Sequence, residues 1–525
     1  MSNIWEDDVW FFDFEVLYDD WIMCARHYKT KEQFFAHNNP SKVYEFIANT
    51  NPILVGYNCK DYDNYILKGV LCGYEPSMIK RINDFIILEG NKGWEFPFNQ
   101  RIKLPDTSDL MLDVRNISLK EIEGNLGLDI VESTVPFDID RALTKDELDE
   151  LIYYCWKDVD ALIPLFEARK GYLEAKVFIG NKAGVNDRKS LYYTNAQLTA
   201  LVLQAKRQEY NDEYDYVYRK ENDLRYVPQE VIEFVEKYRR GEIVIKKDEG
   251  LDEESLSKSK FKLDFFIGGT PHTLGLGGLH GAKPNYREES DNKRIIVNAD
   301  VESYYPSMII EYDYLSRNVP DKQLFVDIRN ERFEAKHSGN KKVSNALKLP
   351  LNTVFGAQLN QYNDLYDPLM GRSICITGQL LLIELANRLL EIPSLVLIQS
   401  NTDGIMFSVD RVHLDEAKKI INYWQKKTRL GMEIDEIDKV VQKDVNNYCI
   451  LMSNGDVKVK GGFVNNYNGG DFKNKTFSIV AKAVVDFLLK GIPPEETIRN
   501  CNDPLMFQLI GKAGRTYDTV VIEKY

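Results

Sequence analysis

Residues 294–307 read Arg-Ile-Ile-Val-Asn-Ala-Asp-Val-Glu-Ser-Tyr-Tyr-Pro-Ser, and this stretch decides how the chain is interpreted. Its branched apolar residues predict a buried strand that ends in the carboxylate of Asp300. Pro306 suits a tight turn or the first turn of a helix, because its ring fixes φ and it has no N–H to donate. We therefore expect Asp300 at the end of a strand, immediately before a turn or a helix.

A second acid is predicted at the tip of a hairpin. Two apolar runs, 395–398 and 405–409, flank Gln399-Ser-Asn-Thr-Asp-Gly404, and an Asp-Gly dipeptide is typical of a tight turn between antiparallel strands. Each feature is ordinary when it occurs alone. If the two strands are neighbours, however, Asp300 and Asp403 meet.

Between these acids lies a stripe of positive charge. Lys348, Asn352 and Phe355 are spaced i, i+4 and i+7, and Arg332 and Lys336 are spaced i, i+4, so each set shares one face of a helix. A cationic helix face of this kind can bind a triphosphate.

The N-terminal third carries a separate group of acids. Asp13 and Glu15 lie two apart on a predicted strand at 9–17, so both side chains point to one face. Asp63 follows an apolar strand at 53–57, and Tyr154 and Asp158 share a face of an amphipathic helix at 145–167. Two divalent cations held by acids of this kind can activate water against a phosphodiester.

Two neighbouring acids remain alternatives for this group. Asp61 and Asp160 exchange with Asp63 and Asp158 if the alignment slips by a short step. Any single acid of the group is more often a surface residue than a ligand.

The C-terminal motifs resemble, in order, those of family B DNA polymerases. Residues 300–307 look like the DxxSLYPS motif, residues 348–356 look like KxxxNSxYG, and residues 401–404 look like the DTDS turn. Gly268-Gly269 resembles the YxGG link between exonuclease and polymerase parts, and Lys460-Gly-Gly resembles the region that contacts the primer.

This resemblance implies a role for each matching residue. Two Mg²⁺ ions would be held at the primer terminus by Asp300, Asp403 and the carbonyl of Val301, and Mn²⁺ could substitute. The incoming nucleotide would be bound by Lys348, Arg332, Lys336, Asn352, Ser303, Tyr304 and Tyr305. The DNA would be contacted by Gly268, Gly269, Asn58, Tyr448 and Lys460. Tyr305 matches the residue whose ring excludes a 2′-hydroxyl.

The N-terminal acids resemble those of DEDDy 3′→5′ exonucleases, which have a ribonuclease H-like fold. The resemblance implies two further Mg²⁺ ions, a water-positioning role for Tyr154, and metal ligation by Asp13, Glu15, Asp63 and Asp158. The segment 118–127 also looks like a helix of that family.

We therefore predict a multidomain α/β protein with a ribonuclease H-like exonuclease domain and a right-hand polymerase of palm, fingers and short thumb. The predicted boundaries are 1–175 for the exonuclease domain, 176–260 for a connector, 261–320 and 359–462 for the palm, 321–358 for the fingers, and 463–525 for a complete or partial thumb. The layout is similar to that of compact phage polymerases. The short segment between Ser307 and Lys348 disfavours protein-primed initiation.

Three features depart from the family pattern. Asn401 and Gly404 stand where the family has aspartate and serine, so the turn has one acid rather than two. The segment 446–448, Asn-Asn-Tyr, lacks the basic residues usual in the primer grip. The domain that such enzymes often place before the exonuclease is not expected here.

Composition restricts the class of protein without identifying it. The formal net charge of −14 means that DNA binding has to come from local basic surfaces, with candidates at 336–348 and 439–460. Seven scattered cysteines, none spaced as CxxC, argue against a disulfide framework or a zinc site. We expect a monomeric cytoplasmic enzyme, in the host cytoplasm if phage-encoded. Its partners would be primer–template DNA, deoxynucleotides and replication accessory proteins, without a membrane.

Two other readings stay open. The chain could be a metal-dependent exonuclease with a degenerate polymerase domain, or a non-catalytic nucleic-acid-binding protein. Primer extension with Mg²⁺ separates the first from a polymerase, and metal-dependent cleavage or synthesis excludes the second.

Overall fold

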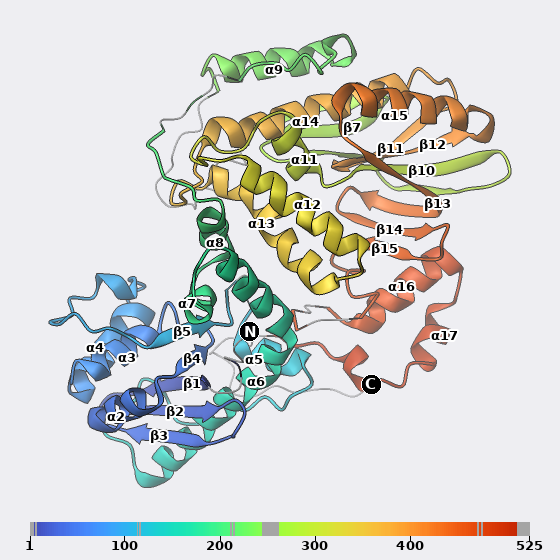
Figure 1. The fold of residues 1–525 in the computed structure, drawn as a ribbon. Coiled ribbons are helices and arrows are strands. Elements are labelled where there is room, and N and C mark those ends of the chain that lie inside the picture. Colours follow the sequence, from blue (N-terminus) through green and yellow to red (C-terminus); the bar gives the residue numbers. More distant parts are fainter. Residues whose placement is uncertain are drawn as a thin grey trace. The chain divides into compact units, whose positions relative to one another are not determined.

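The computed structural model describes residues 5, 8–112, 114, 117–210, 213, 216–243, 262–469, 472–473 and 476–511 (Figure 1). The chain forms two compact α/β units. The first consists mainly of Met1–Leu198, and the second of Thr199–Gly469 with Thr476–Phe507. Residues 244–260 of the predicted connector and 512–525 of the predicted thumb lie outside the described residues.

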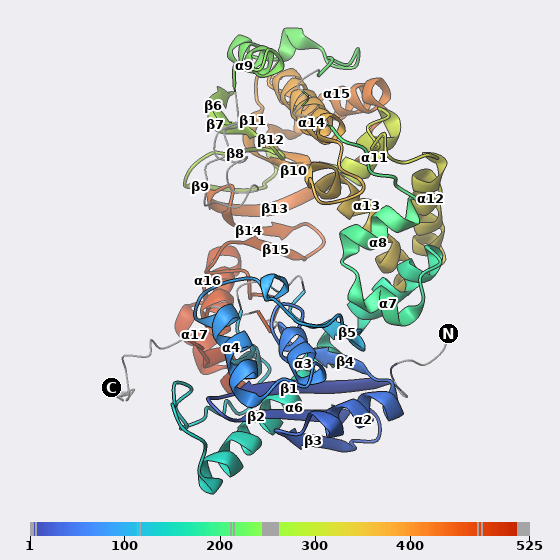
Figure 2. The same cartoon turned by 90° about the vertical axis from the view of Figure 1, so that its left-hand side faces the viewer.

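The first unit is built on a mixed sheet with the strand order β3-β2-β1-β4-β5 (Figure 2). Its strands are β1 (Val9–Val16), β2 (Trp21–His27), β3 (Gln33–His37), β4 (Ile53–Gly56) and β5 (Asp106–Asp109). β1, β4 and β5 run parallel, whereas β2 is antiparallel to both β1 and β3. The strands predicted at 9–17 and 53–57 are confirmed.

Alternate residues of β1 enter two different cores, because successive side chains of a strand point to opposite faces. Odd-numbered residues such as Phe11 pack with α6, and even-numbered residues such as Phe12 pack with α2, α3 and α4. Asp13 and Glu15 continue the odd-numbered set. The helices of this unit are α2 (Pro40–Thr50), α3 (Asp63–Leu71), α4 (Pro76–Ile87), η1 (Gly93–Glu95), α5 (Leu119–Asn125), α6 (Lys145–Lys182) and α7 (Asp187–Tyr192).

Helix α6 is longer than the pattern predicts. The helix begins at Lys145 as predicted, with Thr144 as its N-cap, but it has 38 residues and passes through the boundary predicted at residue 175. That boundary is wrong as the end of an element, and the first unit continues to Leu198. The charged residues beyond 167 look like surface residues in the sequence, yet Arg169 is buried and donates to the backbone oxygen of Leu112 at 2.7 Å.

The second unit contains a larger antiparallel sheet, ordered β15-β14-β13-β10-β12-β11-β8-β7-β6, with β9 paired to β13. Its strands are β6 (Lys262–Ile267), β7 (Thr270–Gly275), β8 (Leu279–Ala282), β9 (Tyr286–Glu289), β10 (Arg294–Val301), β11 (Val396–Thr402), β12 (Gly404–Asp410), β13 (Met432–Asp444), β14 (Asn447–Met452) and β15 (Val457–Lys460). The strand predicted at 294–300 and the hairpin around residue 403 are confirmed as β10 and β11–β12. β10 lies between β12 and β13.

Helices cover this sheet and extend from it, with α12 and α13 side by side (Figure 1). They are α11 (Tyr304–Glu311), α12 (Gln323–His337), α13 (Lys341–Leu359), α14 (Pro368–Leu389), η3 (Arg411–His413), α15 (Leu414–Thr428), α16 (Ser478–Lys490), α17 (Pro494–Arg499) and η4 (Pro504–Phe507). Among the described helices, α14 alone is long and apolar enough to cross a membrane, with a mean hydropathy of 1.4. Its apolar window is 89% buried inside the protein, as in a core helix.

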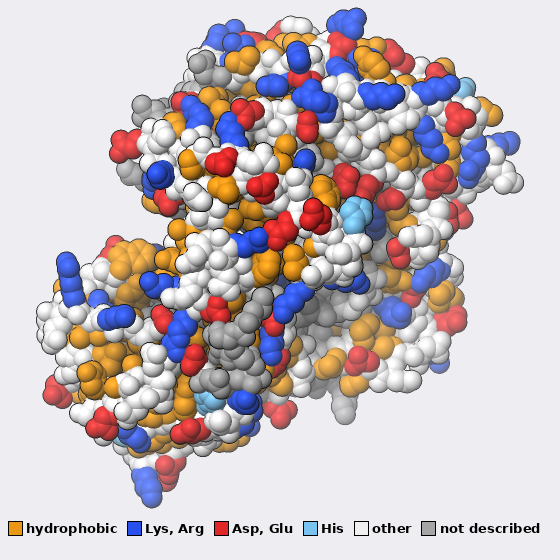
Figure 3. All heavy atoms as spheres, viewed as in Figure 1, with side chains coloured by type: hydrophobic (Ala, Val, Ile, Leu, Met, Phe, Trp, Pro, Cys, Tyr) orange, Lys and Arg blue, Asp and Glu red, His pale blue; other side chains and the backbone are white. Residues whose placement is uncertain are grey.

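The connector predicted at 176–260 is not a separate body in its described part. It contains α8 (Asn195–Val202), η2 (Leu224–Tyr226) and α9 (Gln229–Arg239), and from residue 199 it belongs to the second unit. Asp223 in this segment pairs with Arg388 of α14 at 2.6 Å. On the face shown in Figure 3, Lys and Arg side chains are interspersed with Asp and Glu.

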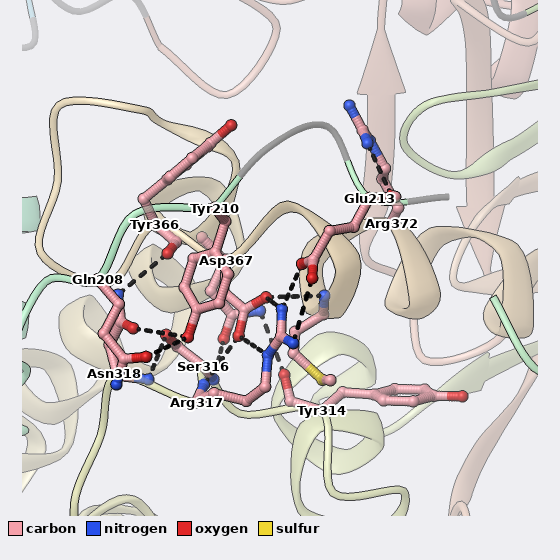
Figure 4. A network of polar contacts seen from close by, with 12 residues as sticks. Gln208, Tyr210, Glu213, Tyr314, Ser316, Arg317, Asn318, Tyr366, Asp367 and Arg372 are labelled. Atoms are coloured by element: carbon pink, nitrogen blue, oxygen red, sulfur yellow. Dashed lines mark hydrogen bonds and ion pairs between the residues drawn. The ribbon is translucent and has the colours of Figure 1, made fainter. Parts of the chain in front are cut away.

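An ion pair between the buried Asp367 and the exposed Arg317 anchors the segment that follows α11 (Figure 4). Asp367, with no exposed surface, accepts from Arg317 Nη2 at 2.6 Å and from Arg317 Nε at 2.9 Å. Tyr210 places its ring under the same guanidinium, 4.4 Å from the ring centroid. Because removing one partner leaves a buried charge uncompensated, this contact holds the start of α14 to the segment after α11.

Candidate active sites

The end of β10 and the tip of the β11–β12 hairpin form the first candidate site. Asp300 pairs directly with Gly404 across β10 and β12. The backbone N–H of Val301 donates to the backbone oxygen of Asp403 at 2.8 Å. The strands that carry the two acids are therefore neighbours, and the acids lie at the same end of the sheet.

The positive φ of this hairpin turn lies on a different residue from the glycine that the Asp-Gly dipeptide suggests. The Asp403 N–H donates to the Asn401 oxygen at 2.7 Å, and Thr402, not the glycine, takes the positive φ of 60°. A Cβ on Gly404 would lie 1.6 Å from Asp300 Oδ1. The glycine is thus required by the close approach of the Asp300 carboxylate, and the turn places its strain on a β-branched residue.

The two acids line a cavity of about 200 Å³ on the sheet. It is bounded by Asn298, Asp300, Gln399, Asn401, Asp403, Gly404, Met406, Ile437, Tyr448, Ile450, Met452 and Lys458. Burial raises the pKa of Asp403 to about 6, and the neighbouring Asp300 adds to the rise. Burial also raises the pKa of Asp300, against a hydrogen bond from Asn298 and the charge of Lys458.

Two residues expected to contact DNA lie near these acids. Tyr448 lines the cavity, and Lys460 lies on the strand next to that of Tyr448. Asn401 Nδ2 is 3.5 Å from the hydroxyl oxygen of Tyr448, which lines the cavity. Lys460 on β15 is the register partner of Tyr448 on β14. The Asn401 amide thus faces Tyr448 beside the two acids.

The segment after Asp300 connects the acids to the helical pair. Tyr305 stacks on Phe355 of α13 with ring centroids 4.2 Å apart and planes at 12°. Ser303, the N-cap of α11, has φ of 49° and accepts from Arg332 Nη1 at 3.3 Å. Asp403 is close enough to raise the pKa of Tyr305, although burial is the larger cause.

The remaining nucleotide-binding candidates differ in exposure. Tyr304 is buried against α14, where a Cβ on Gly378 would lie 2.2 Å from its hydroxyl oxygen. Lys348 and Asn352 are exposed on α13, and Lys336 is exposed on α12. No described contact joins these three exposed side chains to the acids.

Gly268 and Gly269 lie away from this site. They form the two-residue turn between β6 and β7, with φ of 54° and 76°, as a tight hairpin requires. The registers of β7 with β8 and of β8 with β11 put this turn at the end of the sheet opposite Thr402.

The second candidate site gathers the N-terminal acids in the first unit. Glu15, Asp63 and Asp158 are all buried, and Asp13 is partly exposed. Burial is the main cause that raises the pKa of Asp13, and the charges of Asp63, Glu15 and Asp158 add to it. Burial also raises the pKa of Asp63, to about 8.

Burial distinguishes Asp63 and Asp158 from the two alternatives, Asp61 and Asp160. Asp61 is exposed, and Asp160 is exposed and paired with Arg26 at 2.7 Å. Asp63 and Asp158, in contrast, interact electrostatically with Glu15. The structure thus brings Asp63 and Asp158 into the cluster and leaves the two alternatives outside.

Two further residues support this site and were not expected from the sequence. Asp109 at the end of β5 accepts from the backbone N–H of Asn58 at 2.9 Å, and Asn58 has φ of 59°. Lys120 on α5 forms an ion pair with Asp158 and lies 4.7 Å from the ring centroid of Tyr154. Asp109 ends a short polar strand, and such a pattern does not identify a site residue in the sequence. Lys120 lies inside the segment 118–127 that resembles an exonuclease helix, so that segment could have indicated it.

Both donor sets fit hard divalent cations, which prefer carboxylate oxygens. The Oδ1 atom of Asp63 is buried and has no hydrogen-bond partner among the described residues, as expected of a ligand. In the second unit, the donors are the carboxylates of Asp300 and Asp403 and, from the sequence, the Val301 carbonyl.

No family model matches this sequence, and no curated protein matches it. Among solved structures, it is similar to the family B DNA polymerase of the hyperthermophilic archaeon Pyrobaculum calidifontis, at 12% identity and a TM-score of 0.45. The match covers 94% of this chain and 64% of the archaeal one. The chain therefore spans less than two thirds of that polymerase, and the function rests on the sites themselves.

Proposed function

We propose that this chain is a DNA-dependent DNA polymerase of the family B type with its own 3′→5′ exonuclease, and that it serves in replication. The observation that carries the proposal is the pairing of Asp300 with Gly404, which places two acids remote in sequence on one cavity. The stacking of Tyr305 on Phe355 and the contact of Arg332 with Ser303 join the segment after Asp300 to α13 and α12.

In this proposal the residues of the second unit position the primer terminus and the incoming nucleotide. Asp300 and Asp403 hold two Mg²⁺ ions, which when bound lower the pKa of the primer 3′-hydroxyl and neutralise charge on the triphosphate. Arg332 and Lys348 bind the phosphates of the incoming nucleotide. Tyr305, held flat by Phe355, excludes a ribose 2′-hydroxyl.

The first unit removes mismatched 3′ ends in the same proposal. Asp13, Glu15, Asp63 and Asp158 hold its two Mg²⁺ ions, and Tyr154 orients the attacking water. Several buried carboxylates close together repel one another unless cations neutralise them, and this favours a metal site over a purely structural cluster. Partners would be primer–template DNA and deoxynucleotides, in a monomeric cytoplasmic enzyme of a phage-type layout.

One observation favours a second candidate, an exonuclease without synthesis. Asn401 leaves the hairpin tip with one acid, whereas the N-terminal site has four. In that case the second unit would bind DNA only.

Primer extension on a labelled mismatched hairpin separates the candidates, because it reports both activities. With Mg²⁺ and deoxynucleotides we expect trimming followed by extension on the mismatched hairpin. On a matched hairpin, extension should be lost in Asp403→Asn and kept in Asp13→Asn. Trimming without extension in the wild type would leave the exonuclease alone. If the protein shows neither activity at any Mg²⁺ or Mn²⁺ concentration, it is a nucleic-acid-binding protein without catalysis.

A further inference from the structure

A thiol lies among the N-terminal acids. Ligand atoms of Asp13, Glu15 and Cys155 all lie within 4.8 Å of one another. Cys155 follows Tyr154 on α6, is fully buried, and its Sγ is 3.7 Å from the backbone oxygen of Asp13. The proposed exonuclease chemistry uses only oxygen ligands and gives this sulfur no part.

The thiol changes which cations the cluster can hold. Mg²⁺ takes oxygen ligands and discriminates against sulfur, whereas Zn²⁺ and Cd²⁺ bind thiolate together with carboxylate. Donor atoms around one tetrahedral Zn²⁺ lie about 3.5 Å apart, given bonds of about 2.0 to 2.3 Å. The three ligand atoms, which lie within 4.8 Å of one another, would have to approach by at most about 1.3 Å to reach that spacing.

A second observation points to a ligand at the same place. Asp63 is 3% exposed, and its Oδ1 atom has no hydrogen-bond partner among the described residues. Its charge acts on both Asp13 and Glu15, so this carboxylate belongs to the same cluster. Asp13 is partly exposed and gives a path for an ion from solvent.

We propose that Asp13, Glu15 and Cys155 form a site for a thiophilic divalent cation of the Zn²⁺ or Cd²⁺ class, with Cys155 as the sulfur ligand. On binding, a metal–sulfur bond replaces the S–H bond, and the proton leaves to solvent. Such an ion displaces Mg²⁺ and stops removal of 3′ ends. The binding stands on the cluster alone, and only the inhibition rests on the proposed exonuclease.

Cadmium titration of the full-length, reduced protein tests the binding without any assay of activity. We expect an ultraviolet thiolate-to-cadmium absorption band in the wild type. Cys155→Ser should lose that band and weaken cadmium affinity, measured by calorimetry, by about tenfold or more. Cys449→Ser is the matched control, because Cys449 is also buried but belongs to the second unit and lies outside the three-ligand cluster.

Asp13→Asn provides a variant that keeps the thiol. It should also weaken cadmium binding while its circular dichroism stays that of the wild type. The proposal is overturned if the wild type shows no band, if Cys155→Ser keeps it, or if Cys449→Ser alone removes it.

A separate activity measurement tests the inhibition. Zn²⁺ added to the Mg²⁺-supported reaction should arrest 3′-end removal by the wild type and Cys449→Ser at concentrations that Cys155→Ser tolerates. Equal inhibition of all three overturns this half of the proposal. If the cadmium band behaves as expected but no variant removes 3′ ends with Mg²⁺ alone, the exonuclease assignment fails and the metal site stands.

Discussion

Replacing Gly404 with alanine provides a stringent test of the polymerase site. A Cβ there would lie 1.6 Å from Asp300 Oδ1, 2.8 Å from its Cγ and 3.3 Å from the Ala299 backbone oxygen. The nearest atom is the end of a side chain, so the backbone can stay in place while the carboxylate moves. The substitution thus acts on Asp300 without changing the charge of the site.

The size of the effect follows from this geometry. Real Cβ atoms essentially never approach other atoms closer than 3.0 Å, so a carboxylate oxygen at 1.6 Å has to move by about 1.4 Å. Misplacement of a catalytic group by about 1 Å costs about 100-fold in rate. We therefore expect single-turnover nucleotide incorporation by Gly404→Ala to fall by about 100-fold, or about 2.7 kcal/mol.

Gly431→Ala is the matched control, because its Cβ would meet only Glu302 Oε2, at an ordinary 3.7 Å. Circular dichroism reports folding of the variant, and the 3′-end removal proposed for the first unit should stay unchanged. Gly404→Ser should be at least as slow as Gly404→Ala, although serine is the residue usual at this position in family B polymerases. Extension at the wild-type rate by Gly404→Ala would refute the close approach of Asp300 or its catalytic role.

Three other predictions concern the remaining groups. Asp13→Ala with Glu15→Ala should abolish removal of mismatched 3′ ends and leave synthesis on a matched hairpin largely intact; equal loss of both activities contradicts this. Tyr305→Ala should increase ribonucleotide incorporation, and Phe355→Ala should do so by about 2- to 10-fold, since an aromatic pair contributes about 0.5–1.5 kcal/mol; unchanged sugar discrimination argues against the assignment. Burial raises the pKa of Asp63 from 3.8 to about 8 in the folded chain, so between these pH values the folded protein binds more protons than the unfolded chain. The free energy of unfolding of the metal-free protein should therefore fall as pH rises from 3.8 to 8. Thermal unfolding should show Mg²⁺ raising Tm more at pH 8 than at pH 5, and Asp63→Asn should flatten this dependence; a pH-independent Mg²⁺ effect in the wild type is inconsistent with it.

Local pattern was sufficient for the elements that carry the acids. The apolar run before Asp300 and the paired runs around Asp403 predict strands and a hairpin, and all are present. Such features depend on residues next to each other in the chain, where propensity and periodicity act directly. The spacing of Tyr154 and Asp158 on one helix face is of the same kind.

Tertiary structure alone decided which residues enter each site. Asp63 rather than Asp61, and Asp158 rather than Asp160, are buried with Glu15, because burial depends on how helices pack on the sheet. The same packing brings Lys458 and Lys120 to the acids, although the sequence named neither lysine as a site residue.

The reason for the glycine at 404 shows this division most clearly. From the sequence alone, an Asp-Gly dipeptide marks a turn that needs a positive φ. In the structure, Thr402 takes the positive φ, and the glycine leaves room for a carboxylate from a strand remote in sequence. Local propensity predicts that a hairpin forms, but only the register between β10 and β12 determines what its residues contact.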